Sequence, residues 1–331
     1  MDIVKCEVLW TRMCPLKCEY CAMATGRANS ITVNEFRKGV LNLKSLGCKF
    51  MAFYGAEPLE DFYKLPAAIK AAEENGIATT VITSGVTPYF HYKLDVLYKM
   101  GLRSLTMSYD IDGLGKWSDI KTSKAMEGLK YFGRLGPIRD KAVVVTLTHA
   151  NYKNLIPTIE EMSHRGIWTF FDFIHSDRKQ PGSKCKSVDY HLLFDEGDYP
   201  ELRKVLTQVV DMKAAGYLCH SSRQFIGLIS DNDFDLIREY NWNCAKEPDF
   251  PAWVTMDCDG NMYCCDDFQI YDGRLFHVTN LLDEWKEFKE YWRPQVLEKC
   301  PGCCWNTHID AHLVKRGEVP ITDYVHGLGG V

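Results

Sequence analysis

Short apolar, β-rich runs alternate with amphipathic helical patterns from the start of the chain to about residue 175. The runs that predict strands are residues 3–10, 50–54, 79–83, 104–108, 142–148 and 169–174. Between them, apolar residues recur at helical spacing and predict helices over 33–46, 62–74, 91–99, 124–135 and 155–165. Several of these stretches stop at a glycine, the usual end signal of a helix, as at Gly47, Gly76, Gly101 and Gly166.

This alternation predicts an α/β fold with a parallel sheet and right-handed crossovers. Six strand–helix units favour a partial (β/α)6 barrel of the TIM type over a short open sheet, with the active site on the loops after the strands. Two more helical patterns, 199–215 and 221–240, follow a polar segment. We therefore expect a core barrel over residues 1–215, a linker helix over 216–240 and a small cysteine-rich domain over 241–331.

Composition narrows the function classes. The 331 residues carry 39 Lys+Arg against 44 Asp+Glu, a net charge of −5, which argues against nucleic-acid binding through a broad basic face. No apolar run approaches the ~18 residues that a membrane-spanning helix needs. The first residues, MDIVKCEVLW, lack the features of a secretory signal, so we expect a cytoplasmic protein without a membrane partner.

The 14 cysteines change this picture, because cysteine clusters in an intracellular enzyme are more often metal-binding or catalytic than disulfide-bonded. Cys14, Cys18 and Cys21 form a C-x3-C-x2-C motif in the loop after the first predicted strand. A structural zinc site usually takes four protein ligands. Three thiolates are typical of a [4Fe–4S] cluster with one iron left open to a small molecule. Half of a zinc site completed by remote residues is the alternative.

The motif, with aromatic Tyr20 before its last cysteine, resembles that of the radical S-adenosylmethionine superfamily. After the second strand, Gly55-Ala56-Glu57-Pro58 is similar to the GGEP motif of that superfamily, with alanine at the second glycine. The resemblance implies that these four residues bind the methionine part of S-adenosylmethionine, with the Glu57 carboxylate near its ammonium.

Two further strand ends resemble positions of the same superfamily. Thr83 and Ser84 end the third strand, and Ser108 and Asp110 end the fourth. The resemblance implies that their hydroxyls and carboxylate meet the adenosyl ribose; turn capping is the alternative role for each hydroxyl. It further implies that the open iron chelates S-adenosylmethionine and that an electron, from a reductant such as flavodoxin or ferredoxin, cleaves it. The resulting 5′-deoxyadenosyl radical then removes a hydrogen atom from substrate.

The last third of the chain carries a second cysteine group. Cys244-x15-Gly260-x4-Cys265 followed by Cys300-x2-Cys303 resembles the SPASM/twitch extension of the superfamily, in its shorter twitch form. The resemblance implies one auxiliary [4Fe–4S] cluster held by four thiolates, those of Cys244, Cys265, Cys300 and Cys303.

Two choices stay open in this second group. Cys264 and Cys304 are each adjacent to an expected ligand, and a four-Cys zinc ribbon is the alternative site. Asp266 follows Cys265 and is a candidate catalytic base, because an acid at this position accepts a proton in several SPASM enzymes; a carboxylate at the hairpin edge is the alternative.

The leading interpretation is a radical S-adenosylmethionine enzyme with one auxiliary cluster, acting in natural-product or peptide modification. Only 13 residues precede Cys14, so a peptide substrate would need a separate peptide-recognition protein. A small-molecule alcohol dehydrogenase of the same superfamily, acting on an aminocyclitol-like substrate, is the second interpretation. A non-catalytic zinc or Fe–S binding module is the alternative from another class.

Overall fold

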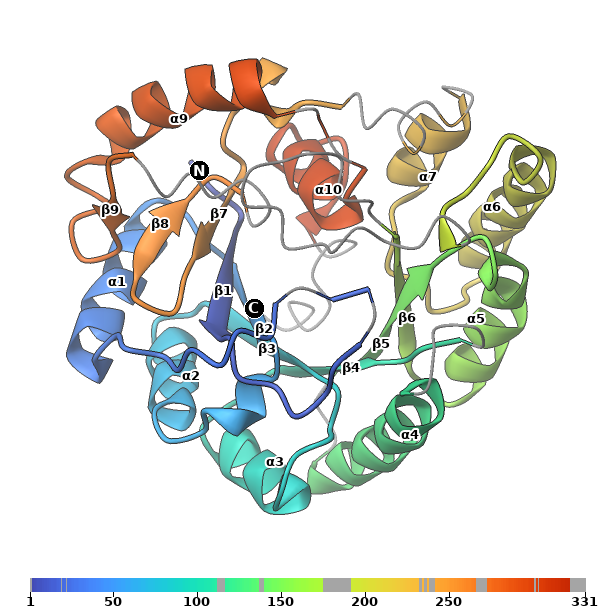
Figure 1. Cartoon of the computed structure of the whole chain (residues 1–331), viewed down its shortest axis with the longest axis horizontal. Coiled ribbons are helices and arrows are strands. Elements are labelled where there is room, and N and C mark those ends of the chain that lie inside the picture. Colours follow the sequence, from blue (N-terminus) through green and yellow to red (C-terminus); the bar gives the residue numbers. More distant parts are fainter. Residues whose placement is uncertain are drawn as a thin grey trace.

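We describe a computed structural model of residues 2–321, apart from 19, 22, 112–116, 137–139, 175–191, 232–233, 235–236, 238–241, 266–272, 301 and 303. Figure 1 shows a curved sheet in the middle of the molecule with helices arranged around its outside. Among the described residues, no helix has the length and apolar character needed to cross a membrane.

Six parallel strands form the barrel wall and follow the order of the sequence. They are β1 (Lys5–Thr11), β2 (Phe50–Gly55), β3 (Ala78–Thr83), β4 (Ser104–Ser108), β5 (Asp140–Leu147) and β6 (Trp168–Phe173). Sequential parallel neighbours require a crossover helix between each pair, as the alternating pattern predicts. All carboxyl ends of these strands consequently meet at one end of the barrel.

The crossover helices cover the outer face of the sheet (Figure 1). They are α1 (Val33–Ser45), α2 (Leu65–Glu74), α3 (Phe90–Lys99), α4 (Ser118–Leu135) and α5 (Leu155–His164), followed by α6 (Tyr199–Ala214) and α7 (Arg223–Asp231). A capping box fixes the start of α1, because Thr32 accepts a hydrogen bond from the Glu35 amide and Glu35 accepts one from the Thr32 amide. The α/β fold with six barrel strands is confirmed.

Helix α4 begins six residues earlier than its apolar pattern predicts. The inward positions of its first turn are Ser118 and Lys121, both buried, and the first buried apolar residue is Ala125. Hydrophobic periodicity detects only apolar inward positions, so it places the start at residue 124.

The C-terminal segment extends the barrel sheet. Strand β7 (Trp253–Met256) pairs in parallel with β1, and β8 (Asn261–Tyr263) and β9 (Phe276–His277) add antiparallel strands, so the sheet runs on across the predicted boundary at residue 241. A hairpin turn at Asp259-Gly260 joins β7 to β8. Gly260 has a φ of +86° there, and the Asp257 carboxylate accepts from the Asn261 amide at 2.9 Å.

Two helices complete the C-terminal segment, α9 (Trp285–Lys299) and α10 (Asn306–Lys315). Helix α10 lies across the opening between the two edges of the partial barrel (Figure 1). On one side its Asn306 amide donates to Asp172 of β6 at 2.8 Å, and on the other its His308 ring stacks on Trp253 of β7 with 3.6 Å between ring centroids. Helix α10 therefore closes the gap that six strands leave open.

Candidate active site

The three front cysteines lie on a loop that is closed at its base. The Arg12 amide donates to the Arg27 carbonyl at 2.8 Å, and the amides of Thr25 and Gly26 donate back to the Arg12 carbonyl at 3.1 and 2.9 Å. The loop thus leaves β1 and returns to the same place. Cys14, Cys18 and Cys21, separated in sequence, all line one cavity of about 340 Å³ at the carboxyl ends of the strands.

The segment after β2 holds the start of this loop. Gly55 has a φ of +145°, and a Cβ atom there would lie 2.4 Å from the Thr11 carbonyl oxygen, so only glycine fits. The Ala56 amide donates to that same carbonyl at 3.0 Å, and the Glu57 amide donates to the Met13 carbonyl at 2.8 Å. Gly55 and Ala56 line the cavity beside the cysteines, so this segment both positions the loop and forms a wall.

The Glu57 carboxylate is fully buried and is bonded within the protein. It accepts hydrogen bonds from the Thr83 hydroxyl at 2.5 Å and from the Ser84 amide and hydroxyl at 2.9 and 2.6 Å. Burial raises the pKa of Glu57, and the bonds from Ser84 and Thr83 oppose that rise. Thr83 and Ser84 line the cavity, whereas Glu57 does not, so its carboxylate lies behind the wall that these two residues form.

Half-buried Tyr20 and the buried residues Asp110 and Lys121 form a triad that joins the cysteine loop to β4 and α4. The Tyr20 hydroxyl lies 3.2 Å from both carboxylate oxygens of Asp110, and the Lys121 ammonium is 2.6 Å from Asp110 Oδ2 and also bonds the Tyr20 hydroxyl. Burial and the Asp110 charge raise the pKa of Tyr20. Ser108 and Lys121 line the cavity. Sequence reasoning missed Lys121; the available signal is a lysine four residues before Ala125, on the inward face of α4.

The front site fits an iron–sulfur cluster better than a zinc ion. Tetrahedral Zn–S bonds of about 2.3 Å hold thiolates less than about 4 Å apart, and of the described residues no trio of cysteines has all its Sγ atoms within 4.8 Å of one another. A cube whose thiolates bind different irons spreads them further apart. Burial raises the pKa of Cys14 to about 11, so binding to the metal must drive its deprotonation.

A second cavity of about 270 Å³ lies inside the barrel and adjoins the first. Tyr20, Cys21, Tyr54 and Ile82 line both cavities. The walls are largely apolar, but the lining also includes four charged or ionisable residues that sequence reasoning missed: Lys5, Glu7, Asp172 and His308. The available signal is the alternation Lys5-x-Glu7 within a strand that is otherwise apolar and fully buried.

The structure brings Cys244, Cys264 and Cys300 near one another. The side chain of Asn243, beside Cys244, donates to the carbonyls of Val296 and Cys300 at 3.1 and 3.3 Å, which fixes the 244 segment against the end of α9. Burial raises the pKa of Cys264, and the neighbouring thiols of Cys244 and Cys300 raise it further. Cys265 is half-buried, while Cys303 and Asp266 lie outside the described residues.

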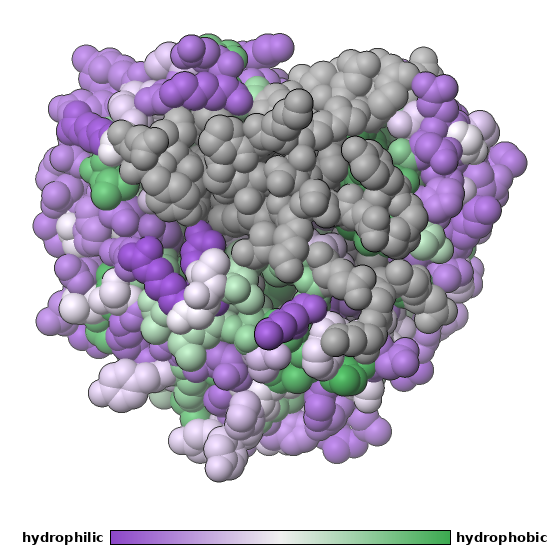
Figure 2. Space-filling view, in the orientation of Figure 1, coloured by the Kyte–Doolittle hydropathy of each residue, from purple (hydrophilic) through white to green (hydrophobic). Residues whose placement is uncertain are grey.

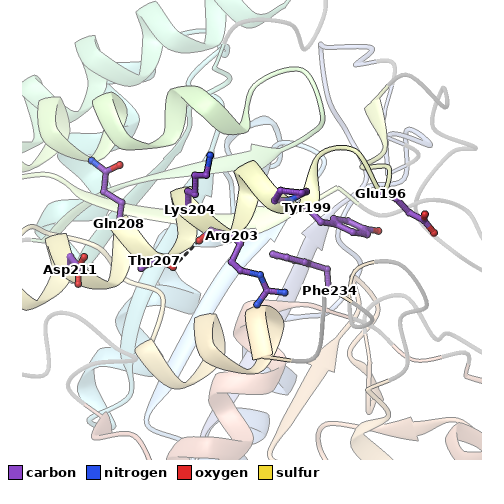
Figure 3. Close-up of a pocket in the computed structure, with 9 residues that line it drawn as sticks. Glu196, Tyr199, Arg203, Lys204, Thr207, Gln208, Asp211 and Phe234 are labelled. Carbon is purple, nitrogen blue, oxygen red and sulfur yellow. Dashed lines mark hydrogen bonds between the residues drawn. The ribbon is translucent and has the colours of Figure 1, made fainter.

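A more open cavity of about 790 Å³ lies outside the barrel, along α6 and beside Phe234 (Figure 3). Tyr199 and Phe234 stack there with 5.0 Å between ring centroids, and the Arg203 guanidinium packs over the Phe234 ring. None of the residues that line it is a cysteine or histidine. Hydrophilic side chains dominate the described periphery of the barrel mouth seen in Figure 2.

Comparison with known proteins agrees with this site. Residues 8–162 match the family model described as the Radical SAM superfamily. The fold is similar to SuiB of Streptococcus suis, with a TM-score of 0.68, 16% identity, and 95% of this chain and 74% of that chain covered. Another SuiB structure is bound to its precursor peptide SuiA. The fold is also similar to anSMEcpe with bound AdoMet and Cp18Cys peptide, with a TM-score of 0.62, 14% identity and coverage of 88% and 81%.

Proposed function

Because residues 8–162 match the Radical SAM superfamily model, we propose that the chain is a radical S-adenosylmethionine enzyme that cleaves S-adenosylmethionine reductively and removes a hydrogen atom from a substrate held inside the barrel. The single observation that carries this proposal is the junction of two cavities. The first is lined by Cys14, Cys18 and Cys21, and the second shares Tyr20, Cys21, Tyr54 and Ile82 with it. A non-catalytic zinc or Fe–S module does not account for this arrangement, and the family consists of enzymes.

The three front thiolates would hold a [4Fe–4S] cluster. When bound and reduced, this cluster supplies the electron that cleaves S-adenosylmethionine to methionine and a 5′-deoxyadenosyl radical. The protein supplies the rest of the site. Gly55 and Ala56 form the wall proposed for the methionine part, while Thr83, Ser84 and Ser108 form the wall proposed for the adenosyl part. Helix α10 and the apolar cavity walls keep water away from the reacting atoms.

An auxiliary [4Fe–4S] cluster is the proposed role of the C-terminal cysteines. Cys244, Cys265, Cys300 and Cys303 are its proposed ligands, with Cys264 as the competing choice at the hairpin. The first turn of α10, which follows the CxxC motif, contributes Trp305, Thr307 and His308 to the inner cavity. A cluster held just before this turn would be placed to accept an electron from substrate. Asp266, beside Cys265, is the proposed acceptor of the accompanying proton.

A peptide is the preferred substrate class. SuiB and anSMEcpe have each been seen with a peptide, and their folds cover most of this chain. The inner cavity of about 270 Å³ has room for one side chain, so the rest of a peptide would extend out of the barrel mouth. A small polar molecule such as an aminocyclitol, oxidised at an alcohol, is the second candidate because the same volume would hold it entirely.

Reduction of the reconstituted protein tests the proposal. We expect about eight irons per chain, four for each cube, and dithionite-dependent formation of methionine and 5′-deoxyadenosine in equal amounts, followed by mass spectrometry. About four irons with intact cleavage would remove the auxiliary cluster and retain the radical enzyme. Zinc without iron, or iron without cleavage, would overturn the proposal.

A further inference from the structure

The inner cavity has a polar floor that the proposed reaction does not explain. Lys5 and Glu7 point into it from alternate positions of β1, Asp172 from β6 and His308 from α10. All four are buried, each with less than a tenth of its surface exposed. Charged side chains in a barrel interior are costly, so their presence calls for partners of opposite charge.

Two of the four floor residues, Lys5 and Glu7, form an ion pair with each other. The Lys5 ammonium bonds Glu7 Oε1. His308 Nε2 lies 3.9 Å from the other Glu7 oxygen, and its ring is fixed by stacking on Trp253. The positive charge of Lys5 is therefore already matched by Glu7.

Among the described residues that line the cavity, Asp172 is the carboxylate with no ion pair. One of its oxygens accepts from the Asn306 amide at 2.8 Å, and within the described part of the chain this carboxylate makes no other hydrogen bond. Burial raises its pKa well above the usual range; the Asn306 bond and Lys5 oppose the rise, and the charges of Glu7 and Asp310 add to it. Burial therefore favours the neutral form of Asp172 when the cavity contains no cation.

The charges of the described residues at the cavity floor indicate which class of ligand would fit it. One lysine faces two carboxylates, Glu7 and Asp172, with Asp310 behind them and bonded to Ser222. A ligand with one positive charge would pair with Asp172, the lining carboxylate that Lys5 does not bond. A carboxylate or phosphate would instead add a third negative group to a buried site.

We infer that the floor binds a primary ammonium carried on an aliphatic stem, with Asp172 as its counter-ion. Ile82, Val144, Phe170 and Ile174 line the walls and would pack against the stem. The stem would then run from Asp172 toward Tyr20 and Cys21, so that one of its C–H bonds faces the first cavity; this last step rests on the proposed function. Two sources have this chemistry, a lysine side chain within a peptide and a small free alkylamine.

Calorimetric titration of the reconstituted, unreduced protein tests the inference without any turnover. The probes are n-butylammonium, Nα-acetyl-lysine N-methylamide and its neutral isostere Nα-acetyl-norleucine N-methylamide. Both amines are expected to bind, and the norleucine compound to bind at least about 10-fold more weakly, because it cannot form an ion pair with Asp172; a 10-fold difference corresponds to about 1.4 kcal/mol. Tighter binding of the lysine amide indicates a peptide source, and tighter binding of butylammonium a small amine.

Asp172→Asn removes the charge and keeps an oxygen for the Asn306 amide. We expect this substitution to lower the affinity for both amines at least about 10-fold and to leave the affinity for the norleucine compound unchanged. Asp172→Glu, which restores the charge, should recover part of the affinity. The control is Asp198→Asn, a buried carboxylate bonded to His149 outside the cavity, which should bind as the unmodified protein does.

Proton release gives a second readout. Titrations in two buffers of different ionisation enthalpy should show release of up to one proton per amine bound by the unmodified protein and none with Asp172→Asn. Equal affinity for the lysine and norleucine amides, unchanged amine affinity in Asp172→Asn, or no amine binding at millimolar concentration would each overturn the inference. Because no reductant is present, these outcomes are independent of whether S-adenosylmethionine is cleaved.

Discussion

Ser84 donates two hydrogen bonds to Glu57, from its amide at 2.9 Å and from its hydroxyl at 2.6 Å. This contact connects the loop after β2 to the end of β3 and leaves the Glu57 carboxylate no exposed surface. Glu57 therefore holds the segment after β2 against the end of β3 by hydrogen bonds inside the protein. We expect Glu57 to influence ligand binding indirectly, by fixing the positions of Thr83 and Ser84.

Glu57→Ala is expected to destabilise the protein as well as the site. It leaves buried donors of Thr83 and Ser84 without an acceptor, at about 1–3 kcal/mol for each such donor. Urea unfolding should show a lower free energy of unfolding, and equilibrium binding should show weaker affinity for S-adenosylmethionine. Glu60→Ala is the control, because half-buried Glu60 accepts from Thr87 at the outer end of the same turn. Equal losses in the two variants would contradict this role of Glu57.

Single alanine variants of Cys14, Cys18 and Cys21 should each abolish reductive cleavage of S-adenosylmethionine. Three thiolates are the minimum set for a cube with one open iron, so none is dispensable. Formation of 5′-deoxyadenosine measures the loss. Cys48→Ala removes a buried thiol that bonds the Phe50 carbonyl away from the cavities and should retain cleavage. Cleavage by any of the three front variants would contradict the assignment of its cysteine.

Cys300→Ala should lower the iron content by up to four per chain while leaving cleavage in place. The proposed auxiliary ligands come from the C-terminal segment, and none of them is among the described residues that line the front cavity. Iron analysis of Cys264→Ala and Cys265→Ala then decides which hairpin cysteine is the ligand, since only the ligand's variant should lose iron. An unchanged iron count in Cys300→Ala would remove this residue from the set.

Lys121→Met should lower the reduction potential of the front cluster. Its ammonium lies close enough to Cys18 to lower the pKa of that thiol against the dominant effect of burial, and a nearby cation favours the reduced cluster. A charge interaction of about 2 kcal/mol, at about 1.4 kcal/mol for each 59 mV of a one-electron couple, gives a fall of tens of millivolts.

Potentiometry followed by electron paramagnetic resonance measures this shift. Lys121→Arg keeps the charge and should restore most of the potential. Lys124→Met removes a lysine that pairs with Glu127 on the exposed part of the same helix, so it should have little effect. A potential in Lys121→Met equal to that of the unmodified protein would contradict this effect of the Lys121 charge.

The strands and crossover helices could be predicted because their chemistry is local. Buried parallel strands are apolar runs, and the helices between them carry regular apolar faces. The start of α4 could not be predicted in this way, because the polar residues Ser118 and Lys121 occupy its inward positions. The polar floor was missed for a related reason: a lysine and a glutamate in a strand do not reveal that both side chains point into a closed interior.

The candidate cysteine ligands could be predicted because the spacing between cysteines is read directly from the sequence. The direction in which a carboxylate points cannot be read from the sequence, so Glu57 could be identified as a candidate but not placed behind the cavity wall. The position of α10 also depends on contacts distant in sequence, through Asn306 to Asp172 and through His308 to Trp253. No local pattern encodes those contacts.

The pairing of β7 with β1 makes the two halves of the chain inseparable. A protein truncated after residue 240 would expose the hydrogen-bonding edge of β1, a strand whose every residue is buried in the intact chain. Such an unprotected edge invites strand addition by another molecule, and the shortened protein would self-associate. Because the front cysteine loop leaves from the end of β1, the C-terminal segment protects the strand on which the radical chemistry depends.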